Sequence, residues 1–290
     1  MSKNCLLETL LGVIDAAGMS NHLLLIGHGY LGAAVATRFR DAGWRVTPVS
    51  LHGGEGGVLA CDVADAAAVA GLPAADAIVH CAASGRGGAD AYRRVYVDGC
   101  ENLARAFPGV PLLFTSSTSV YGQTDGATVT ETSAAEPDRE TGNLLLAAEA
   151  IVLGAAGFVA RLSGIYGPGR SVILRKFLAG EAVIEDDGRR WLNQIHRDDA
   201  AEAVFHLLAN GMPPGIYNVS DSEPLGQREC YEAMARIFLL PVPPAGPRDL
   251  NRKRGWTHKR VSNAKLRDSG WEPRFPCYLD AIESIRPADG

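Results

Sequence analysis

The sequence predicts an α/β protein in which a doubly wound parallel sheet carries helices on both faces, followed by a smaller C-terminal lobe. Short apolar runs alternate with helix-length stretches through the first half of the 290-residue chain, as in parallel strands joined by crossover helices. After Gly167 this alternation loosens into longer loops. With 47% hydrophobic and 21% charged residues, the chain has the composition of a globular protein with a large core.

Six apolar runs of five or six residues, the usual length of a strand, are expected to form the sheet. They are residues 22–26, 44–49, 57–61, 77–81, 111–115 and 157–162. Helices are expected between them near residues 31–42, 64–70, 90–106 and 143–153. In the C-terminal lobe we expect helices near 199–209 and 228–238, a strand at 216–219 and proline-rich turns around 241–247.

A glycine-rich turn, LLLIGHGYLG at residues 23–32, joins the first predicted strand to the first helix. Gly27, Gly29 and Gly32 have the spacing in which the first glycine allows a tight turn, the second admits a diphosphate and the third lets helix and strand pack closely. The N-terminus of the helix then faces the phosphates. We therefore expect dinucleotide binding here, with Tyr30 and Leu31 in the same turn. A glycine-rich turn without a ligand is the alternative.

The end of the second predicted strand bears on the choice between NAD and NADP. NAD-binding turns of this type carry an acidic side chain about 20 residues further on, which binds the adenine ribose. Here Ser50 and His52 occupy this region, and no carboxylate appears before Glu55. The missing carboxylate slightly favours NADP, although no arginine follows the strand to hold a 2′-phosphate.

Charge and composition argue against several classes of partner. The net charge of −5 is spread along the chain, which argues against nucleic acid. No apolar run approaches the roughly 20 residues that a membrane-spanning helix needs. Six cysteines are scattered without paired spacing, so we expect a reducing, cytoplasmic location and no metal site. Residues 1–18 are interpreted as an N-terminal extension, because Met19 offers a second plausible start.

Four further segments follow the glycine-rich turn in a characteristic order. They are HCAAS (80–84), FTSSTSVYG (114–122), RLSGIYGPGR (161–170) and QIHRDDAAEAV (194–204). Together they resemble the extended and atypical short-chain dehydrogenase/reductases, especially the NAD-dependent epimerase/dehydratase group. This resemblance implies a Rossmann-like dinucleotide-binding domain at residues 19–166. Residues 167–290 would form mainly a substrate-binding lobe, with some segments returning to the core sheet.

The resemblance also implies roles at matching positions. Ser117, four residues before Tyr121, would hydrogen-bond the substrate oxygen. The cofactor would lie against Asp62, Val63, Cys81, Ala82, Ala83 and Ser163. Local alternatives remain, since Asp62 is a good turn former and the Ser117 hydroxyl can be satisfied by the backbone.

The sequence departs from the family at its acid–base residues. Alignment places Thr141 at the catalytic tyrosine, Leu145 at the activating lysine and Tyr96 at the usual asparagine. A threonine hydroxyl cannot replace a tyrosine that titrates as hydride moves. Thr141 is therefore expected at most to bind a ligand oxygen.

Three other side chains are candidates for the proton carrier. Tyr121 follows the strand that carries Ser117, and its alternative role is to pack beneath the following loop. His196 titrates near neutrality when unperturbed, and its alternative role is to fix the approach to the 199–209 helix. His80 lies on a predicted buried strand, where a hydrogen-bonded core histidine is the favoured interpretation.

Substrate contacts and oligomeric state are also suggested by the sequence. The basic cluster at 252–260 contains Arg254 and Arg260, which suit a phosphorylated or carboxylated ligand, and a solvated surface is the alternative. The 143–153 helix is apolar nearly all round. With the 90–106 helix it would form a homodimer seam of the kind common in the resembled family. A monomer with a covered helix is the alternative.

The leading hypothesis is an NAD(P)-dependent oxidoreductase or epimerase acting on a small hydroxylated or nucleotide-linked sugar substrate. The loss of three acid–base residues favours a different class, a non-catalytic protein that binds NAD(P) as a sensor or regulator. A dehydratase or isomerase that recycles a tightly held cofactor is a third possibility.

Overall fold

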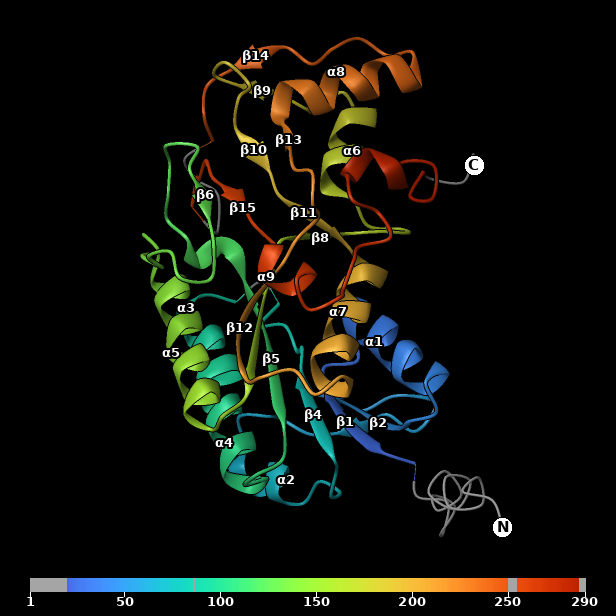
Figure 1. The fold of residues 1–290 in the computed structure, drawn as a ribbon, viewed down its shortest axis with the longest axis vertical. Helices are drawn as coiled ribbons and strands as arrows, with labels where there is room; N and C mark the ends of the chain where they lie inside the picture. Colours follow the sequence, from blue (N-terminus) through green and yellow to red (C-terminus); the bar gives the residue numbers. More distant parts are fainter. Residues whose placement is uncertain (1–19, 86, 250–254, 287–290) are drawn as a thin grey trace, which may run out of the picture.

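A seven-stranded parallel sheet forms one end of the molecule in the computed structural model, which describes residues 20–85, 87–249 and 255–286 (Figure 1). Its strand order is β12-β7-β5-β4-β1-β2-β3. The strands are β1 (His22–Ile26), β2 (Arg45–Ser50), β3 (Leu59–Ala60), β4 (Ala77–His80), β5 (Leu112–Ser117), β7 (Phe158–Leu162) and β12 (Gly215–Val219). The predicted doubly wound α/β fold is confirmed, and the strand expected at 216–219 is the seventh member of the sheet.

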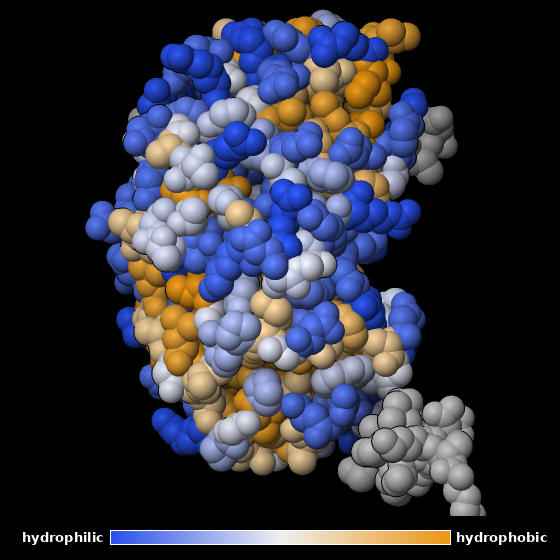
Figure 2. All heavy atoms as spheres, in the orientation of Figure 1, coloured by the Kyte–Doolittle hydropathy of each residue, from blue (hydrophilic) through white to orange (hydrophobic). Residues whose placement is uncertain are grey.

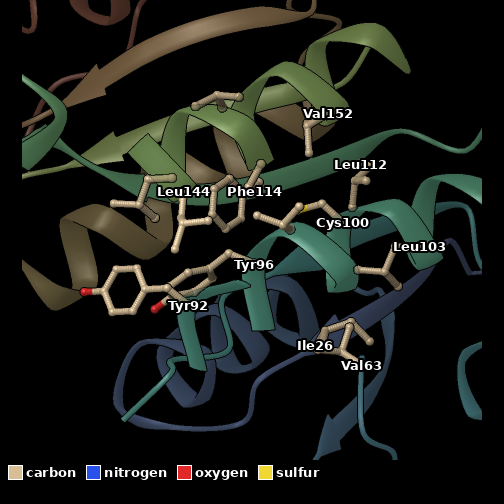
Figure 3. Close-up of a cluster of buried hydrophobic side chains, with 14 of the residues drawn as sticks. Ile26, Val63, Tyr92, Tyr96, Cys100, Leu103, Leu112, Phe114, Leu144 and Val152 are labelled. Atoms are coloured by element: carbon tan, nitrogen blue, oxygen red, sulfur yellow. The ribbon is translucent and has the colours of Figure 1, made fainter. Parts of the chain in front are cut away.

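Helices cover both faces of this sheet because alternate strand residues point in opposite directions. On one face, Leu23 and Leu25 pack into a core with α1 (Tyr30–Asp41) and α7 (Arg197–Ala209). On the other face, Leu24 and Ile26 belong to a core that also contains residues of α4 (Gly99–Ala106) and α5 (Glu140–Gly154). Figure 3 shows part of this second core, including Tyr92, Tyr96, Phe114 and Leu144.

The helix predicted at 90–106 is interrupted by a wider turn. It consists of α3 (Ala89–Tyr92), a π-helical segment η1 (Arg93–Asp98) and α4. A π-helical turn rotates the side chains that follow it relative to a regular helix, and such turns are frequent at functional sites. Tyr96 lies inside the π-helical segment.

A second lobe lies beyond the sheet and has its own apolar core (Figure 1). It includes α6 (Val172–Leu178), α8 (Gln227–Phe238) and the strands β9 (Ile184–Glu185), β10 (Trp191–Leu192), β13 (Leu225–Gly226) and β14 (Ala245–Gly246). Its core contains Leu174, Phe177, Tyr231, Met234 and Tyr278. The helix expected at 228–238 is confirmed.

Short pairings outside the main sheet join segments that are far apart in sequence. The strand β8 (Gly164–Tyr166) pairs in parallel with β11 (Gln194–His196). The strand β6 (Thr128–Val129) pairs in parallel with β15 (Arg260–Val261). The helix α9 (Ala264–Arg267) packs near β12. Parts of the C-terminal half therefore return to the sheet, while the extension predicted at 1–18 lies outside the described residues.

A buried ion pair links α5 to the sheet. The Glu149 carboxylate on α5 accepts hydrogen bonds from the Arg161 guanidinium on β7, with Oε2–Nη2 at 2.6 Å. Ser116 Oγ donates to Glu149 Oε1 at 2.5 Å. Arg161 Nη1 donates to Tyr121 Oη at 2.9 Å, and this hydroxyl donates to Asn218 Oδ1 on β12 at 2.8 Å. The network ties α5 and three strands together behind the end of β5.

Two further observations concern the whole described chain. Across the described ranges, no helix has both the length and the apolar character needed to cross a membrane. Five of the six cysteines are described and all five are free thiols, which are Cys61, Cys81, Cys100, Cys230 and Cys277.

The buried ion pair leads to a stability prediction. We expect Glu149→Gln to lower the free energy of unfolding by about 3–5 kcal/mol, because it leaves the Arg161 charge buried without a counterion. Urea unfolding followed by circular dichroism measures this loss. The control is Glu181→Gln, which removes an exposed partner of Arg175 and should change the free energy of unfolding by less than about 1 kcal/mol. Equal effects of the two substitutions would contradict the prediction.

Candidate functional site

A cavity of about 220 Å³ opens where four strands of the sheet end. Gly27 follows β1, Cys81 follows β4, Ser117 ends β5 and Ser163 follows β7. Ligands of doubly wound sheets bind at the carboxyl ends of the strands, where the strand order reverses. The cavity is lined by Gly27, Gly29, Tyr30, Leu31, Cys81, Ala82, Ala83, Tyr96, Thr115, Ser116, Ser117, Leu162, Ser163, Ile165 and Arg170.

The three glycines of the turn after β1 meet three different surroundings. Gly27 has φ +102°, and an added Cβ would lie 2.3 Å from the Ala82 nitrogen. At Gly32 an added Cβ would lie 1.9 Å from the Gly27 carbonyl oxygen. At Gly29 an added Cβ would meet no described protein atom within 4 Å. Protein packing therefore explains the first and third glycines, whereas the second borders open space that a ligand can use.

The N-terminus of α1 faces this open space. Gly29 is its N-cap residue, and no side chain caps the first turn, which also contains no acidic residue. The first backbone N–H groups of a helix have no partners within the helix, and its dipole favours an anion at this end. This arrangement suits a diphosphate, as in other glycine-rich turns that open a helix.

Arginine side chains lie near the same turn. Tyr30 Oη donates to the Pro168 carbonyl oxygen at 3.2 Å. The guanidinium groups of Arg170 and Arg197 each lie 5.1 Å from the centre of the Tyr30 ring. Of these two arginines, Arg170 lines the cavity. Tyr30 thus connects the glycine-rich turn to the loop that follows β8, and Arg170 adds positive charge to the cavity wall.

The residues expected near the adenine lie outside the cavity lining. Ser50 Oγ donates to the Gly53 carbonyl oxygen at 2.9 Å, and His52 is exposed. Asp62 accepts from the Ala64 amide at 3.0 Å and pairs with Arg94 at 2.7 Å. Val63 is buried in the core. Asp62 therefore has the turn-forming contact considered as its alternative, and adenine binding at these four positions stays a prediction.

Two of the predicted contact residues have their hydroxyls held by the protein. Ser117 Oγ accepts from the Ser119 amide at 3.2 Å. Ser163 Oγ donates to Ser220 Oγ at 2.8 Å. The Ser163 hydroxyl is therefore engaged within the protein, and cofactor binding by Ser163 stays a prediction.

The structure does not bring Tyr121 and Thr141 to the cavity wall. Tyr121 is fully buried and its hydroxyl is engaged with Arg161 and Asn218. Burial is the main cause that raises its pKa. The suggestion that Tyr121 carries the proton is therefore corrected in favour of a structural role. Thr141 is half-buried on the first turn of α5, and Leu145 lies in the apolar core. The assignment of Thr141 and Leu145 as the family's pair stays a prediction.

Both histidines considered as proton carriers are buried outside the cavity lining. His196 Nδ1 accepts from the Asp198 amide at 3.3 Å at the start of α7, and burial lowers the pKa of the ring. This is the helix-fixing contact that was its alternative role. His80 Nε2 bonds the Val95 carbonyl oxygen at 2.8 Å. Burial lowers the pKa of His80 to about 4, so it is neutral at pH 7.

The predicted basic substrate contacts lie elsewhere. Arg260 is exposed on β15, and its guanidinium lies 5.5 Å from the centre of the Trp191 ring. It is not part of the cavity lining. Arg254 lies outside the described residues. Substrate binding by His196, Arg254 and Arg260 stays a prediction.

Sequence reasoning did not assign four polar residues of the lining to the site, namely Tyr96, Thr115, Ser116 and Arg170. Thr115 and Arg170 lie inside the quoted motifs, so their positions beside Ser117 and after the GPG turn were available signals. The signal for Tyr96 was its alignment with the family's asparagine, whereas the direction of its side chain depends on the π-helical segment. Within the described ranges, no group of three or more His, Cys, Asp or Glu side chains is arranged to hold a metal ion.

Comparison with known proteins agrees with this architecture. A family model described as "NAD dependent epimerase/dehydratase family" matches residues 23–220. Protein YeeZ of Escherichia coli strain K12 is 28% identical over 87% of this chain and 95% of its own length. The 2'-dehydrokanamycin reductase of Streptomyces kanamyceticus is 30% identical over 63% of this chain and 56% of its own length. The structure of MoeE5 in complex with UDP-glucose and NAD is 22% identical, with a TM-score of 0.75, over 91% of this chain and 97% of that one.

Because Gly29 and Gly32 have different surroundings, we expect substitution by alanine to affect the free energy of unfolding differently at the two positions. We expect Gly32→Ala to lower the free energy of unfolding by about 3 kcal/mol, because its methyl group overlaps the Gly27 carbonyl. Gly29→Ala should change this free energy by less than about 0.5 kcal/mol, because the methyl group meets no protein atom. Urea unfolding without added ligand compares the two variants. A Gly29→Ala protein as unstable as Gly32→Ala would contradict the prediction.

Proposed function

The chain belongs to the NAD dependent epimerase/dehydratase family, and on this premise we propose that it is an NAD(P)-dependent oxidoreductase or epimerase. Its proposed substrate is a small hydroxylated or nucleotide-linked sugar. The observation that carries the proposal is the open space at Gly29 beside the uncapped N-terminus of α1. This glycine has no packing reason within the protein, and a diphosphate on the backbone amides supplies one.

The residues of the cavity fit a dinucleotide. The glycine-rich turn would hold the diphosphate, with Arg170 adding charge at the mouth. Ser163 would present its backbone to the nicotinamide side, and Cys81, Ala82 and Ala83 would form the opposite wall. The turn after β2 has no carboxylate beside Ser50 and His52, which supports acceptance of NADP as well as NAD, with a slight preference for NADP.

The chemistry follows from where Ser117 lies. When bound, the dinucleotide supplies or accepts a hydride. From the end of β5, Ser117 would donate a hydrogen bond to the reacting oxygen of the substrate. The Glu149–Arg161 network lies directly behind this strand end through Ser116, so it limits the movement of the Ser117 backbone. Such orientation of reacting groups is a main source of rate enhancement.

Two of the similar proteins support the substrate class. MoeE5 has been seen with UDP-glucose and NAD, and another similar protein is named as a reductase of 2'-dehydrokanamycin. The second candidate function is a non-catalytic NAD(P)-binding sensor or regulatory protein. It is favoured by the leucine at position 145, whose buried side chain cannot activate an acid. Both functions require the dinucleotide, and turnover distinguishes them.

Calorimetry tests the proposed function through dinucleotide binding. We expect NAD⁺ and NADP⁺ to bind the wild-type protein, and Gly29→Ala to weaken binding at least about tenfold, because a methyl group there excludes the diphosphate from the amides. The proposal would be refuted if the wild-type protein bound neither NAD⁺ nor NADP⁺.

Binding followed by oxidation of UDP-glucose would favour the enzyme, provided that Ser117→Ala lowers the rate of oxidation and still binds the cofactor. Binding without turnover by any sugar tested would favour the sensor.

We also propose a homodimer through η1, α4 and α5. The outer side of α5 carries Leu146, Ala147, Ala150 and Ile151, which are half-buried or exposed. Figure 2 shows hydrophobic residues gathered on this side of the molecule. An apolar helix face of this kind is typical of interfaces between subunits. The partner is a second copy of the chain, because the same face would then be covered on both copies.

Sedimentation equilibrium tests this dimer. We expect the wild-type protein to sediment as a dimer, and Ala150→Glu to give a monomer, because two copies of the new carboxylate would be buried across the interface. Ala34→Glu on α1, which lies on the other face of the sheet, is the control and should stay dimeric. A monomeric wild type would contradict the proposal.

A further inference from the structure

The cavity contains a phenol that enters from the helix next to α5. We propose that Tyr96 is the proton donor and acceptor of this site and replaces the tyrosine that the chain lacks at position 141. This inference rests on the proposed function, since it requires a dinucleotide in the cavity. The same side chain stands at the position where the resemblance implies an asparagine.

The position of the ring is fixed by its surroundings. Tyr96 lies in the π-helical segment η1 and is 8% exposed. Its ring packs edge-on against Tyr92 at 5.0 Å between centroids and tilted against Phe114 at 5.7 Å. Figure 3 shows these aromatic side chains together beneath α5. The tyrosine nevertheless lines the same cavity as Ser117. The ring is thus held by the core, and its hydroxyl contacts Ser84, which follows the lining residue Ala83.

The hydrogen bond at the phenolic oxygen suits a group that exchanges a proton. The Ser84 amide donates to Tyr96 Oη at 3.1 Å. Because the oxygen accepts this bond, its own proton remains available, and no acceptor for it is found among the described residues. A donor aimed at the oxygen stabilises the negative charge that remains after the proton leaves. The backbone amide is therefore a hydrogen-bond donor at the atom that would carry this charge.

Other titratable residues of the lining are less suitable. The Tyr30 hydroxyl already donates to the Pro168 carbonyl. The Cys81 thiol donates to the Gly27 carbonyl, and burial raises its pKa to about 12. Arg170 stays protonated at any working pH. The described lining contains the phenols of Tyr30 and Tyr96 and the thiol of Cys81. Of these three groups, only the Tyr96 hydroxyl does not already donate a hydrogen bond to a described protein atom.

The proposed step transfers a proton between Tyr96 and the substrate oxygen, in reduction and in oxidation. When a carbonyl is reduced, its carbon receives the hydride, and the electron pair of the C–O π bond moves onto oxygen. That oxygen takes the proton of Tyr96, and the resulting phenolate regains a proton from water. The carbonyl is reduced and the dinucleotide oxidised. In the reverse direction, the Tyr96 phenolate accepts the hydroxyl proton as hydride leaves the carbon. Ser117 donates a hydrogen bond to the same oxygen.

Proton release on cofactor binding tests the inference without a known substrate. The oxidised nicotinamide is positively charged, so its presence beside the phenol favours the phenolate. Calorimetric titration at about pH 9, in buffers of different ionisation enthalpy, measures the protons released. We expect the wild-type protein to release a proton with NAD⁺ and not with NADH. Tyr96→Phe should bind NAD⁺ within threefold of the wild-type affinity and release none.

Tyr92→Phe is the matched control, because this phenol lies one helical turn earlier in the same aromatic cluster and outside the cavity lining. It should release protons as the wild type does. Equal release by wild type and Tyr96→Phe, or none by a wild type that binds NAD⁺, would overturn the role of Tyr96 and leave dinucleotide binding intact. Failure of the wild type to bind NAD⁺ at all would refute the proposed function as well.

Turnover gives a second readout. With UDP-glucose and NAD⁺ as the probe, Tyr96→Phe should lower the rate of NADH formation about 100-fold, which is typical of a lost general acid or base. Tyr92→Phe should stay within threefold of wild type. An unchanged rate in Tyr96→Phe would overturn the inference.

Discussion

The close approach of the first strand and the first helix is the constraint on which the candidate site depends. An added Cβ at Gly32 would lie 1.9 Å from the Gly27 carbonyl oxygen, so this contact exists only because position 32 has no side chain. The contact brings the N-terminus of α1 over the ends of β1 and β4. From there its backbone amides face the cavity, together with the walls formed by Cys81 and Ser117. The positive end of the helix and the hydrogen-bonding groups of the strands thus converge on one space.

The second feature that shapes the site is the apolar start of α5. Leu144 and Leu145 are buried against the same core as Tyr96 and Phe114. In the family, the corresponding turn carries ionisable groups into the cavity, according to the resemblance. Here Leu144 and Leu145 pack into the apolar core, and the phenol of Tyr96 in the cavity lining comes from η1. The cavity lining contains residues of the glycine-rich turn and of η1 and none of the described residues of α5.

The buried Glu149–Arg161 pair connects these two features. It joins α5 to β7, and through Ser116 and Tyr121 it reaches the end of β5 and the edge strand β12. Buried ion pairs contribute little net stability, but they penalise arrangements in which one partner is left alone. In this protein that penalty holds α5 in one position relative to Ser117. The tyrosine that follows Ser117 is used for this purpose, which explains why its hydroxyl is directed away from the cavity.

The sequence by itself determined the parallel sheet, the glycine-rich turn and Ser117 at the end of the fifth strand of the sheet. These features depend on residues within about ten positions of one another, where apolar periodicity and glycine spacing act directly on the backbone. The tertiary structure decided the directions of Tyr96 and Tyr121, the place of Arg170 beside Tyr30 and the parallel pairing of β8 with β11. Each of these is set by contacts between segments far apart in the chain, and by a π-helical turn that no local pattern announced. The neighbours of a side chain, and not its residue type, determined whether it lines the cavity or packs in the core.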